Sequence, residues 1–254
     1  MKKQLVVARY AEKVSSLAKT SLPTIIYNKG KDDLDYFRPG MRVKNLYNVG
    51  REAHTYLWHI LNNWDNLAET TIFTQADPIT HSPDFLERLE KNYRETTSLT
   101  IRHLPEHPGK WITDKDTIER IQGHEIRYGS ITHFNEMGYY FNTKWFDLLW
   151  NRLFIPEDKP KDPIFGYGAI YSVPIHRIKD RPKSFYKYIF HETEKYPVLL
   201  NAFALEALWY YIWNDFTKYR HVNRFGMPEL PPDPIDFTDP VNFLRKSSFP
   251  KIMN

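Results

Sequence analysis

Short runs of apolar and β-branched residues alternate with helix-like stretches over the first third of the chain, and this alternation is the feature that most constrains the fold. Each run has the length and residue types of a buried strand. Strands are expected at residues 5–8, 24–27, 43–47 and 71–74, with helices at 11–20 and 51–63. Such alternation favours an α/β fold in which a mostly parallel sheet with right-handed crossovers is flanked by helices.

The rest of the chain is expected to complete a single domain. Helices are expected at residues 83–91, 143–153, 183–191 and 198–213, and a glycine-interrupted strand at 164–173. From Pro228 onward, six prolines fall within 27 residues, and proline at that density prevents regular structure. We therefore expect a catalytic domain over residues 1–221 and an extended, Pro-rich C-terminal tail over residues 222–254.

Composition narrows the function classes. Lys and Arg number 35 against 31 Asp and Glu, a net charge of +4 that is too balanced for a protein that coats nucleic acid. The absence of cysteine excludes disulfides, thiolate metal sites and a Cys nucleophile, and suits the cytoplasm. The longest apolar stretch, 197–213, contains Asn201 and Glu206. A central carboxylate is costly in lipid, so this stretch predicts a buried helix and no membrane span.

Polar side chains follow each of the four expected strands. They are cations, amides and carboxylates, namely Arg9, Asn28, Lys29, Arg51, Glu52, Gln75 and Asp77. Because ligands in open α/β sheets bind beyond the carboxyl ends of the strands, we expect these side chains to converge. Gly50 would let the backbone approach a ligand, and Arg51 in a first helical turn suits a phosphate. The same residues also describe an ordinary helix start in which Glu52 favours the helix dipole.

Asp77 is a candidate metal ligand. A carboxylate just beyond a buried strand can hold Mg²⁺ or Mn²⁺ while the metal bridges diphosphate oxygens, and His81 lies close enough in sequence to assist. The alternative is a turn aspartate before Pro78. The acidic run Asp32, Asp33 and Asp35 fits a solvated loop better than a cation site.

Glu206 is a candidate general base. On a helix its neighbours at three, four and seven positions are apolar or aromatic, so its carboxylate lies on an apolar face. Desolvation there would raise its pKa toward the range of a useful base. The alternative is a structural pair with a basic residue such as Arg177 or Arg181.

Two further features carry weaker signals. Gly166 and Gly168 could let an acceptor approach the backbone, or they could form a sheet bulge. His176 could be a base or a ligand, although a lone histidine is more often an ordinary surface or core residue.

The order of several sequence runs resembles an uncharacterised domain-of-unknown-function family of fungi, bacteria and large viruses. The resemblance covers most of residues 5–213 and rests on VVARY, IIYNKG, NVGREAHTYLWHILNNWDNL, TIFTQADP, FGYGAIYSVPIHRIKDRPKSFY and LEALW. That family is in turn similar to divergent GT-A glycosyltransferases, whose nucleotide-sugar donor lies over the first strands and whose metal is held by a D-x-D motif. Here Gln75-Ala76-Asp77 keeps only the final Asp.

The resemblance implies a GT-A-like, Rossmann-like fold and a role for each candidate residue. The nucleotide-diphosphate sugar would be held by Arg9, Asn28, Lys29, Arg51, Glu52 and Gln75, with Mn²⁺ or Mg²⁺ on Asp77. Glu206 would be the base, and Gly168 and His176 would border a glycan or glycoconjugate acceptor.

The expected function is therefore an inverting glycosyl transfer to an acceptor hydroxyl. A non-catalytic sugar- or nucleotide-binding module of the same fold is the main alternative, because the metal motif is incomplete. Metal-dependent phosphodiester hydrolysis is a third hypothesis, which no nuclease-like spacing supports.

Overall fold

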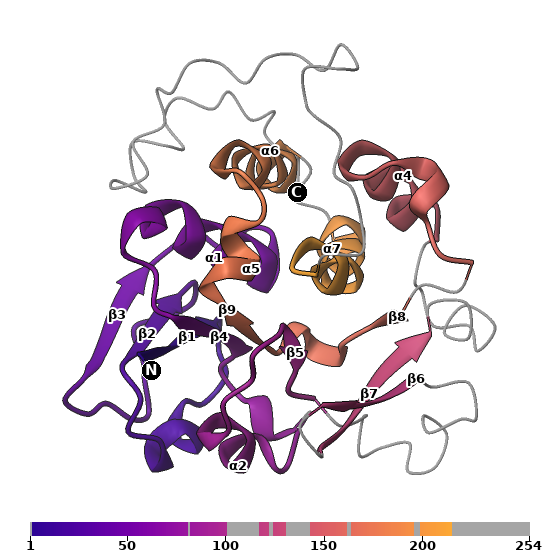
Figure 1. The fold of residues 1–254 in the computed structure, drawn as a ribbon. Coiled ribbons are helices and arrows are strands. Elements are labelled where there is room, and N and C mark those ends of the chain that lie inside the picture. The colour runs from indigo at the N-terminus through magenta and orange to yellow at the C-terminus, as the bar shows by residue number, and fades with distance from the viewer. Residues whose placement is uncertain are drawn as a thin grey trace.

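A six-stranded sheet of order β3-β2-β1-β4-β9-β5 forms the centre of the protein (Figure 1). The computed structural model describes residues 2–80, 82–100, 117–121, 124–130, 143–161, 164–195 and 199–214. The strands of the main sheet are β1 (Lys3–Arg9), β2 (Thr24–Asn28), β3 (Met41–Asn45), β4 (Thr70–Gln75), β5 (Thr97–Ser98) and β9 (Tyr171–Pro174). A second sheet, of order β6-β7-β8, consists of β6 (Thr117–Ile121), β7 (His124–Ser130) and β8 (Ile164–Phe165).

Helices lie on both faces of the main sheet (Figure 1). The α-helices are α1 (Arg51–Asn62), α2 (Phe85–Glu90), α4 (Thr143–Leu153), α5 (Ile175–Lys179), α6 (Lys183–Lys195) and α7 (Leu199–Ile212). The 3₁₀ helices are η1 (Ser15–Lys19), η2 (Trp64–Asn66), η3 (Pro78–Thr80), η4 (Pro156–Asp158) and η5 (Tyr167–Ala169). The predicted α/β fold with a mostly parallel, helix-flanked sheet is confirmed.

The direction of the strands decides which residues can meet. Strands β1, β2, β3 and β4 are parallel, and Arg9 at the end of β1 pairs with Asn28 at the end of β2. Strand β9 is antiparallel to β4, with Pro174 opposite Thr70 at the start of β4. Residues that precede β9 therefore lie toward the carboxyl ends of the parallel strands, whereas residues that follow it lie at the opposite edge.

Alternating residues of β1 divide the core into two layers. Val6 and Ala8 belong to a large cluster shared with α1, α4, α6 and α7, while Leu5 and Val7 belong to a smaller cluster shared with η1 and α2. This alternation follows from the two-residue period of a strand. It confirms that the central strands are buried on both faces, as parallel strands usually are.

From Ala204 onward helix α7 is largely buried, as its sequence predicted. Trp213, just beyond its end, stacks on Phe73 of β4 with ring centroids 5.1 Å apart and on Trp209 at 4.4 Å. A helix that is apolar on all sides is expected in the interior of a protein. Among the described residues, none of the helices has both the length and the apolarity needed to cross a membrane.

Several predicted elements have different bounds in the structure. The expected helix at 11–20 is reduced to η1, because Arg9 Nε donates to the Glu12 carbonyl and the Val14 N–H donates to Asp35, which hold residues 12–14 outside a helix. The expected strand at 43–47 begins at Met41, after Gly40 turns with φ +88°. The expected helix at 83–91 is the shorter α2.

The glycine-interrupted strand expected at 164–173 is two strands separated by η5. Gly168 and Ala169 have φ of +67° and +53°, and left-handed residues cannot continue a strand. The predicted end of the domain at residue 221 and the predicted tail over 222–254 lie outside the described residues.

Gly30→Ala should destabilise the protein strongly. A methyl group at residue 30 would overlap the carbonyl oxygen of Tyr10, a backbone atom that cannot rotate away. We expect a loss of about 3 kcal/mol or more in the free energy of unfolding, measured by chemical denaturation. Gly40→Ala is the matched control, because its methyl group would meet only the Arg38 side chain; backbone strain alone should cost about 1–2 kcal/mol. Equal losses in the two variants would contradict the close approach of residues 10 and 30.

Candidate functional site

A pocket of about 190 Å³ opens where the parallel strands end. Its lining consists of Ala8, Arg9, Tyr10, Glu12, Lys29, Asn48, Arg51, Glu52 and Gln75. Five of the six residues predicted to hold the donor are among them, contributed by the ends of β1, β2 and β4 and by the start of α1. Five of the seven side chains expected to converge thus line one pocket, whereas Asn28 and Asp77 do not, and the ligand remains a prediction.

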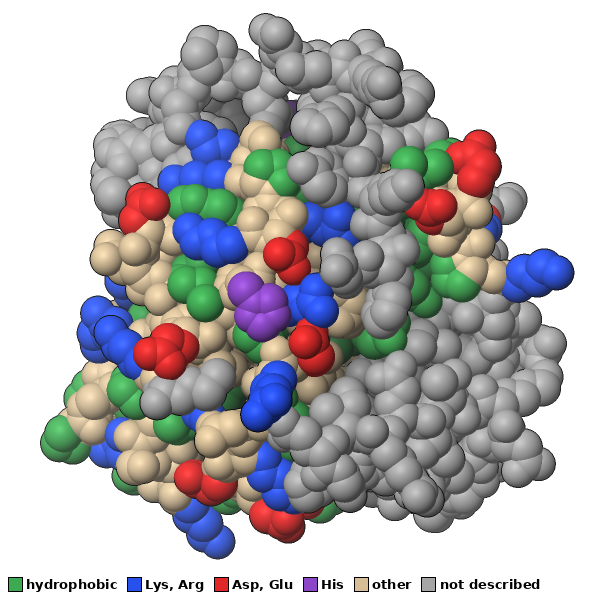
Figure 2. Space-filling view, in the orientation of Figure 1, with side chains coloured by type: hydrophobic (Ala, Val, Ile, Leu, Met, Phe, Trp, Pro, Cys, Tyr) green, Lys and Arg blue, Asp and Glu red, His purple; other side chains and the backbone are tan. Residues whose placement is uncertain are grey.

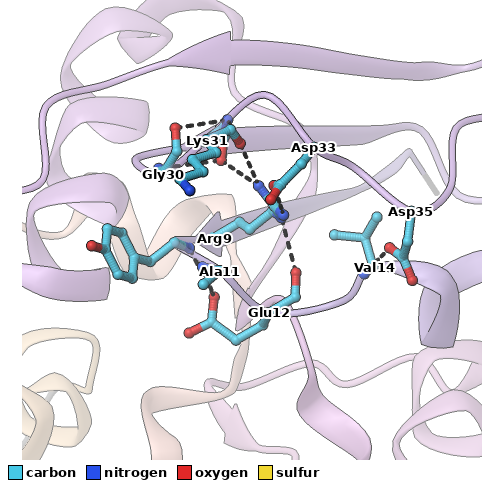
Figure 3. A network of polar contacts seen from close by, with 10 residues as sticks. Arg9, Ala11, Glu12, Val14, Gly30, Lys31, Asp33 and Asp35 are labelled. Carbon is cyan, nitrogen blue, oxygen red and sulfur yellow. Dashed lines mark hydrogen bonds and ion pairs between the residues drawn. The ribbon is translucent and has the colours of Figure 1, made fainter.

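Arg9 makes its hydrogen bonds within the protein (Figure 3). Its guanidinium donates to Asn28 Oδ1 at 2.7 Å, to the Lys31 carbonyl at 3.0 Å and to Asp33 at 2.6 Å. Asn28 does not line the pocket, and its Nδ2 donates to the Lys31 carbonyl at 2.9 Å. These two predicted phosphate ligands order the loop that follows β2. The carboxylate of Asp33 accepts a hydrogen bond from Arg9 within the same loop, in agreement with its interpretation as a loop residue.

Lys29 is a buried amine at the end of β2. The residue is 8% exposed, and its Nζ donates to the Val49 carbonyl at 2.7 Å and to the Arg51 carbonyl. Burial lowers the pKa of Lys29 to about 7, although the negative charge of Glu52 acts in the opposite direction. The pocket therefore contains an amine that can gain or lose its proton near neutral pH.

Two left-handed turns border the site. Gly50 and Arg51 have φ of +57° and +47°, and a side chain at residue 50 would overlap Thr193 of α6, so only glycine fits there. The second turn is Gly168 and Ala169. A non-glycine residue in this region is strained by about 1–3 kcal/mol, and such strain is concentrated at functional sites.

Hydrogen bonds join the second turn to the pocket. Gln75 Nε2 donates to the Gly168 carbonyl at 3.1 Å, and the Tyr56 hydroxyl of α1 donates to the Ala169 carbonyl at 3.1 Å. Gly168 thus lies next to a residue of the pocket wall, and its predicted position beside an acceptor stays a prediction.

Glu206 of α7 accepts the Gly168 N–H at 2.8 Å. Burial raises the pKa of Glu206 to about 8, and the negative charge of Glu52 raises it further, whereas the Gly168 N–H and the charge of Arg51 oppose the shift. Part of the residue nonetheless keeps solvent-accessible surface. Glu206 does not line the pocket itself; it lies one hydrogen bond behind Gly168.

The two arginines named as structural partners of Glu206 do not pair with it. Arg177 pairs with Glu95 and Asp180, on the surface. Arg181 donates to the carbonyls of Tyr211, Ile212 and Asn214. Neither arginine pairs with Glu206, so its buried carboxylate is not explained by an ion pair.

Asp77 lies outside the pocket lining. Its carboxylate accepts the Thr80 hydroxyl at 2.8 Å, as in the turn alternative. Across the part of the chain that the structure describes, His, Cys, Asp and Glu side chains form no group of three or more that could hold a metal. The predicted Mn²⁺ or Mg²⁺ on Asp77 stays a prediction, because a single carboxylate can hold such an ion together with phosphate oxygens. His81 lies outside the described residues.

The acceptor role predicted for His176 does not fit the topology. His176 is exposed on α5, directly after β9. Because β9 runs antiparallel to β4, His176 lies at the sheet edge opposite the pocket. The sequence pattern identified the strand but not its direction.

Tyr10, Glu12 and Asn48 line the pocket and were not predicted to bind a ligand. Tyr10 and Asn48 lie within three residues of a strand end, and that position was their only signal. On the face shown in Figure 2, basic and acidic side chains are interspersed, in keeping with the small net charge.

These features define an α/β protein with a charged pocket at the carboxyl edge of its parallel strands. The chain matches the family model described as "Protein of unknown function (DUF3431)" over residues 5–224, and it belongs to that family. The expected membership of a domain-of-unknown-function family is thus confirmed. Neither the curated proteins nor the solved structures include a match to the chain.

Glu206→Gln should change how stability depends on pH. The pKa of Glu206 is about 8 in the folded protein against 4.5 as its ordinary value. Between these values the folded state binds one more proton than the unfolded state, so this residue's contribution to stability falls as pH rises. The neutral amide of Gln removes this dependence. Between pH 5 and 8 the free energy of unfolding of the variant should therefore rise, relative to that of the wild type, by at most about 1.4 kcal/mol per pH unit.

Denaturant unfolding at several pH values measures this difference. Burial also raises the pKa of Glu194, to about 9, but that residue is common to both proteins and cancels. Glu157→Gln, at an exposed carboxylate, is the control and should run parallel to the wild type. If Glu206→Gln also ran parallel, Glu206 would not hold a proton in the folded protein.

Proposed function

We propose that the protein is a glycosyltransferase that moves a sugar from a nucleotide-diphosphate sugar to a hydroxyl of a glycan or glycoconjugate. The observation that supports it most is the position of Lys29 and Arg51 in a pocket whose wall is hydrogen-bonded through Gly168 to the buried carboxylate of Glu206. Cations for a leaving diphosphate and a carboxylate for an acceptor hydroxyl are the two groups that this transfer needs.

The diphosphate would bind beside Lys29 and Arg51 at the start of α1. Helix N-termini and cationic side chains both favour anions, and a bound diphosphate favours the charged form of Lys29. The pocket of about 190 Å³ is smaller than the roughly 300–1,000 Å³ of most small-molecule sites. The described residues would therefore hold the diphosphate and the start of the sugar rather than the whole donor.

Glu206 would act as the base. The acceptor oxygen attacks the anomeric carbon, the bond from that carbon to the diphosphate oxygen breaks with inversion, and the acceptor proton passes to the Glu206 carboxylate. Glu206 is not fully buried as a residue, and the acceptor hydroxyl would have to reach its carboxylate from the side of Gly168, whose N–H donates to it. Because burial raises the pKa of Glu206 to about 8, the turnover rate should rise with pH up to about that value and then level off.

No step of this proposal passes through a divalent cation, since Asp77, the predicted metal ligand, does not line the pocket. The positive charge that offsets the leaving diphosphate comes from Lys29 and Arg51. A non-catalytic binding module would use the same pocket and the same cations, and binding without turnover would identify it.

Donor binding can be tested with a thermal-shift panel of nucleoside diphosphates and their hexose conjugates, with Mn²⁺ or with EDTA. A ligand at 100 times its dissociation constant stabilises a protein by about 2.7 kcal/mol. We expect one nucleotide to raise the melting temperature in both media, and Lys29→Met to abolish the shift. If no nucleotide stabilised the protein, the donor site would be wrong.

Transfer can then be measured with the donor so identified. Glu206→Gln should lower kcat by a factor of about 10² to 10⁴, the usual contribution of a general base. His176→Ala is the control, because this exposed residue lies at the opposite sheet edge and should leave kcat unchanged. Full activity of Glu206→Gln would remove the base assignment.

A further inference from the structure

Glu52 is a buried carboxylate that faces the pocket without a hydrogen bond. It is the second residue of α1, is 8% exposed and lines the pocket. Its one ion pair joins Oε2 to Arg51 Nε at 3.5 Å. Within the described residues no N–H or O–H group donates a hydrogen bond to this carboxylate. A carboxylate that faces a pocket without a donor from the protein is available to accept a hydrogen bond from a ligand.

The neighbouring donors are engaged with other acceptors. The Tyr56 hydroxyl donates to the Ala169 carbonyl, Gln75 Nε2 donates to the Gly168 carbonyl, and Lys29 Nζ donates to the carbonyls of Val49 and Arg51. A ligand that enters the pocket can therefore supply the donor that Glu52 does not receive from these groups.

The chemistry of a carboxylate selects the kind of group that it can receive. Glu52 is one of the residues predicted to hold the donor. A carboxylate repels the negatively charged oxygens of a nearby phosphate, so Glu52 does not suit the phosphate part of that donor. A hydroxyl is a suitable partner, because an O–H···O⁻ hydrogen bond is short and about twice as strong as a neutral one. Lys29 and Arg51, which border the same pocket, supply the attraction for phosphate.

We propose that Glu52 accepts a hydrogen bond from a hydroxyl of the donor sugar, so that the pocket distinguishes a glycosylated diphosphate from the bare diphosphate. This inference rests on the proposed function and adds a specificity-determining residue to it. Two neighbouring residues of opposite charge in the first turn of α1 then bind different parts of the donor: Arg51 attracts the phosphate and Glu52 accepts the sugar hydroxyl.

Glu52→Gln tests the inference through a ratio of affinities. The diphosphates of uridine, guanosine, adenosine, cytidine and thymidine are first compared by thermal shift. The one that gives the largest shift is then used as a probe, together with its glucose, galactose and mannose conjugates. Titration calorimetry gives the affinity of each. In the wild type the preferred conjugate should bind more tightly than the bare diphosphate.

In Glu52→Gln the bare diphosphate should bind at least as tightly as before, because a like charge has been removed. The preference for the conjugate should fall about tenfold or more, the effect of losing a hydrogen bond to a charged group. Glu52→Asp keeps the charge but shortens the reach, and should lose the preference without strengthening the bare diphosphate. Glu12→Gln is the control, since Glu12 Oε2 already accepts the N–H groups of Tyr10 and Ala11, and its preference should stay unchanged.

Conjugates that lack single hydroxyls locate the contact. The wild type should lose affinity for one deoxy sugar, and Glu52→Gln should not distinguish that sugar from its parent. An unchanged preference in Glu52→Gln, with nucleotides still bound, would overturn this inference and leave the proposed function standing. Failure of the wild type to bind any of the probes would overturn both.

Discussion

The hydrogen bonds from the Lys29 ammonium to the carbonyls of Val49 and Arg51 are the interaction on which the site depends. They tie the end of β2 to the turn that starts α1. That turn has two successive left-handed residues, and Gly50 is pressed against α6 in a space that admits no side chain. The buried amine of Lys29 donates to two carbonyls of this turn and so helps to hold the turn in place. The turn positions Glu52, which lines the pocket.

Opposite charges share a small, mostly buried space at this edge of the sheet. Lys29 and Glu206 both have displaced pKa values, at about 7 and about 8, because burial disfavours each charged form. Groups that titrate near neutral pH in a pocket are typical of functional sites, although ion-pair networks also perturb pKa values. Glu206 lacks an ion-pair partner among the described residues, whereas the carbonyls that Lys29 contacts give that residue a structural role as well as the proposed one.

The sequence predicted the parts of the site that depend on local pattern. β-branched runs located the strands and hence the convergence of Lys29, Arg51 and Gln75, and the apolar helix face located the buried Glu206. The engagement of Arg9 depended on the loop that its own hydrogen bonds order, so no pattern could reveal it. His176 was misplaced because apolar periodicity is the same for parallel and antiparallel strands. The role of Glu52 became visible only once its neighbours' hydrogen bonds were known.

The most direct test of this account is the titration of Lys29, followed by NMR of the protein with isotope-labelled lysine. Lys29→Arg identifies the resonance by its absence. We expect the Lys29 amine of the free protein to titrate with a midpoint near pH 7, because burial lowers its pKa. Inorganic pyrophosphate should raise this midpoint, because a bound anion favours the charged amine. A midpoint near the ordinary value of 10.5, unmoved by pyrophosphate, would contradict it.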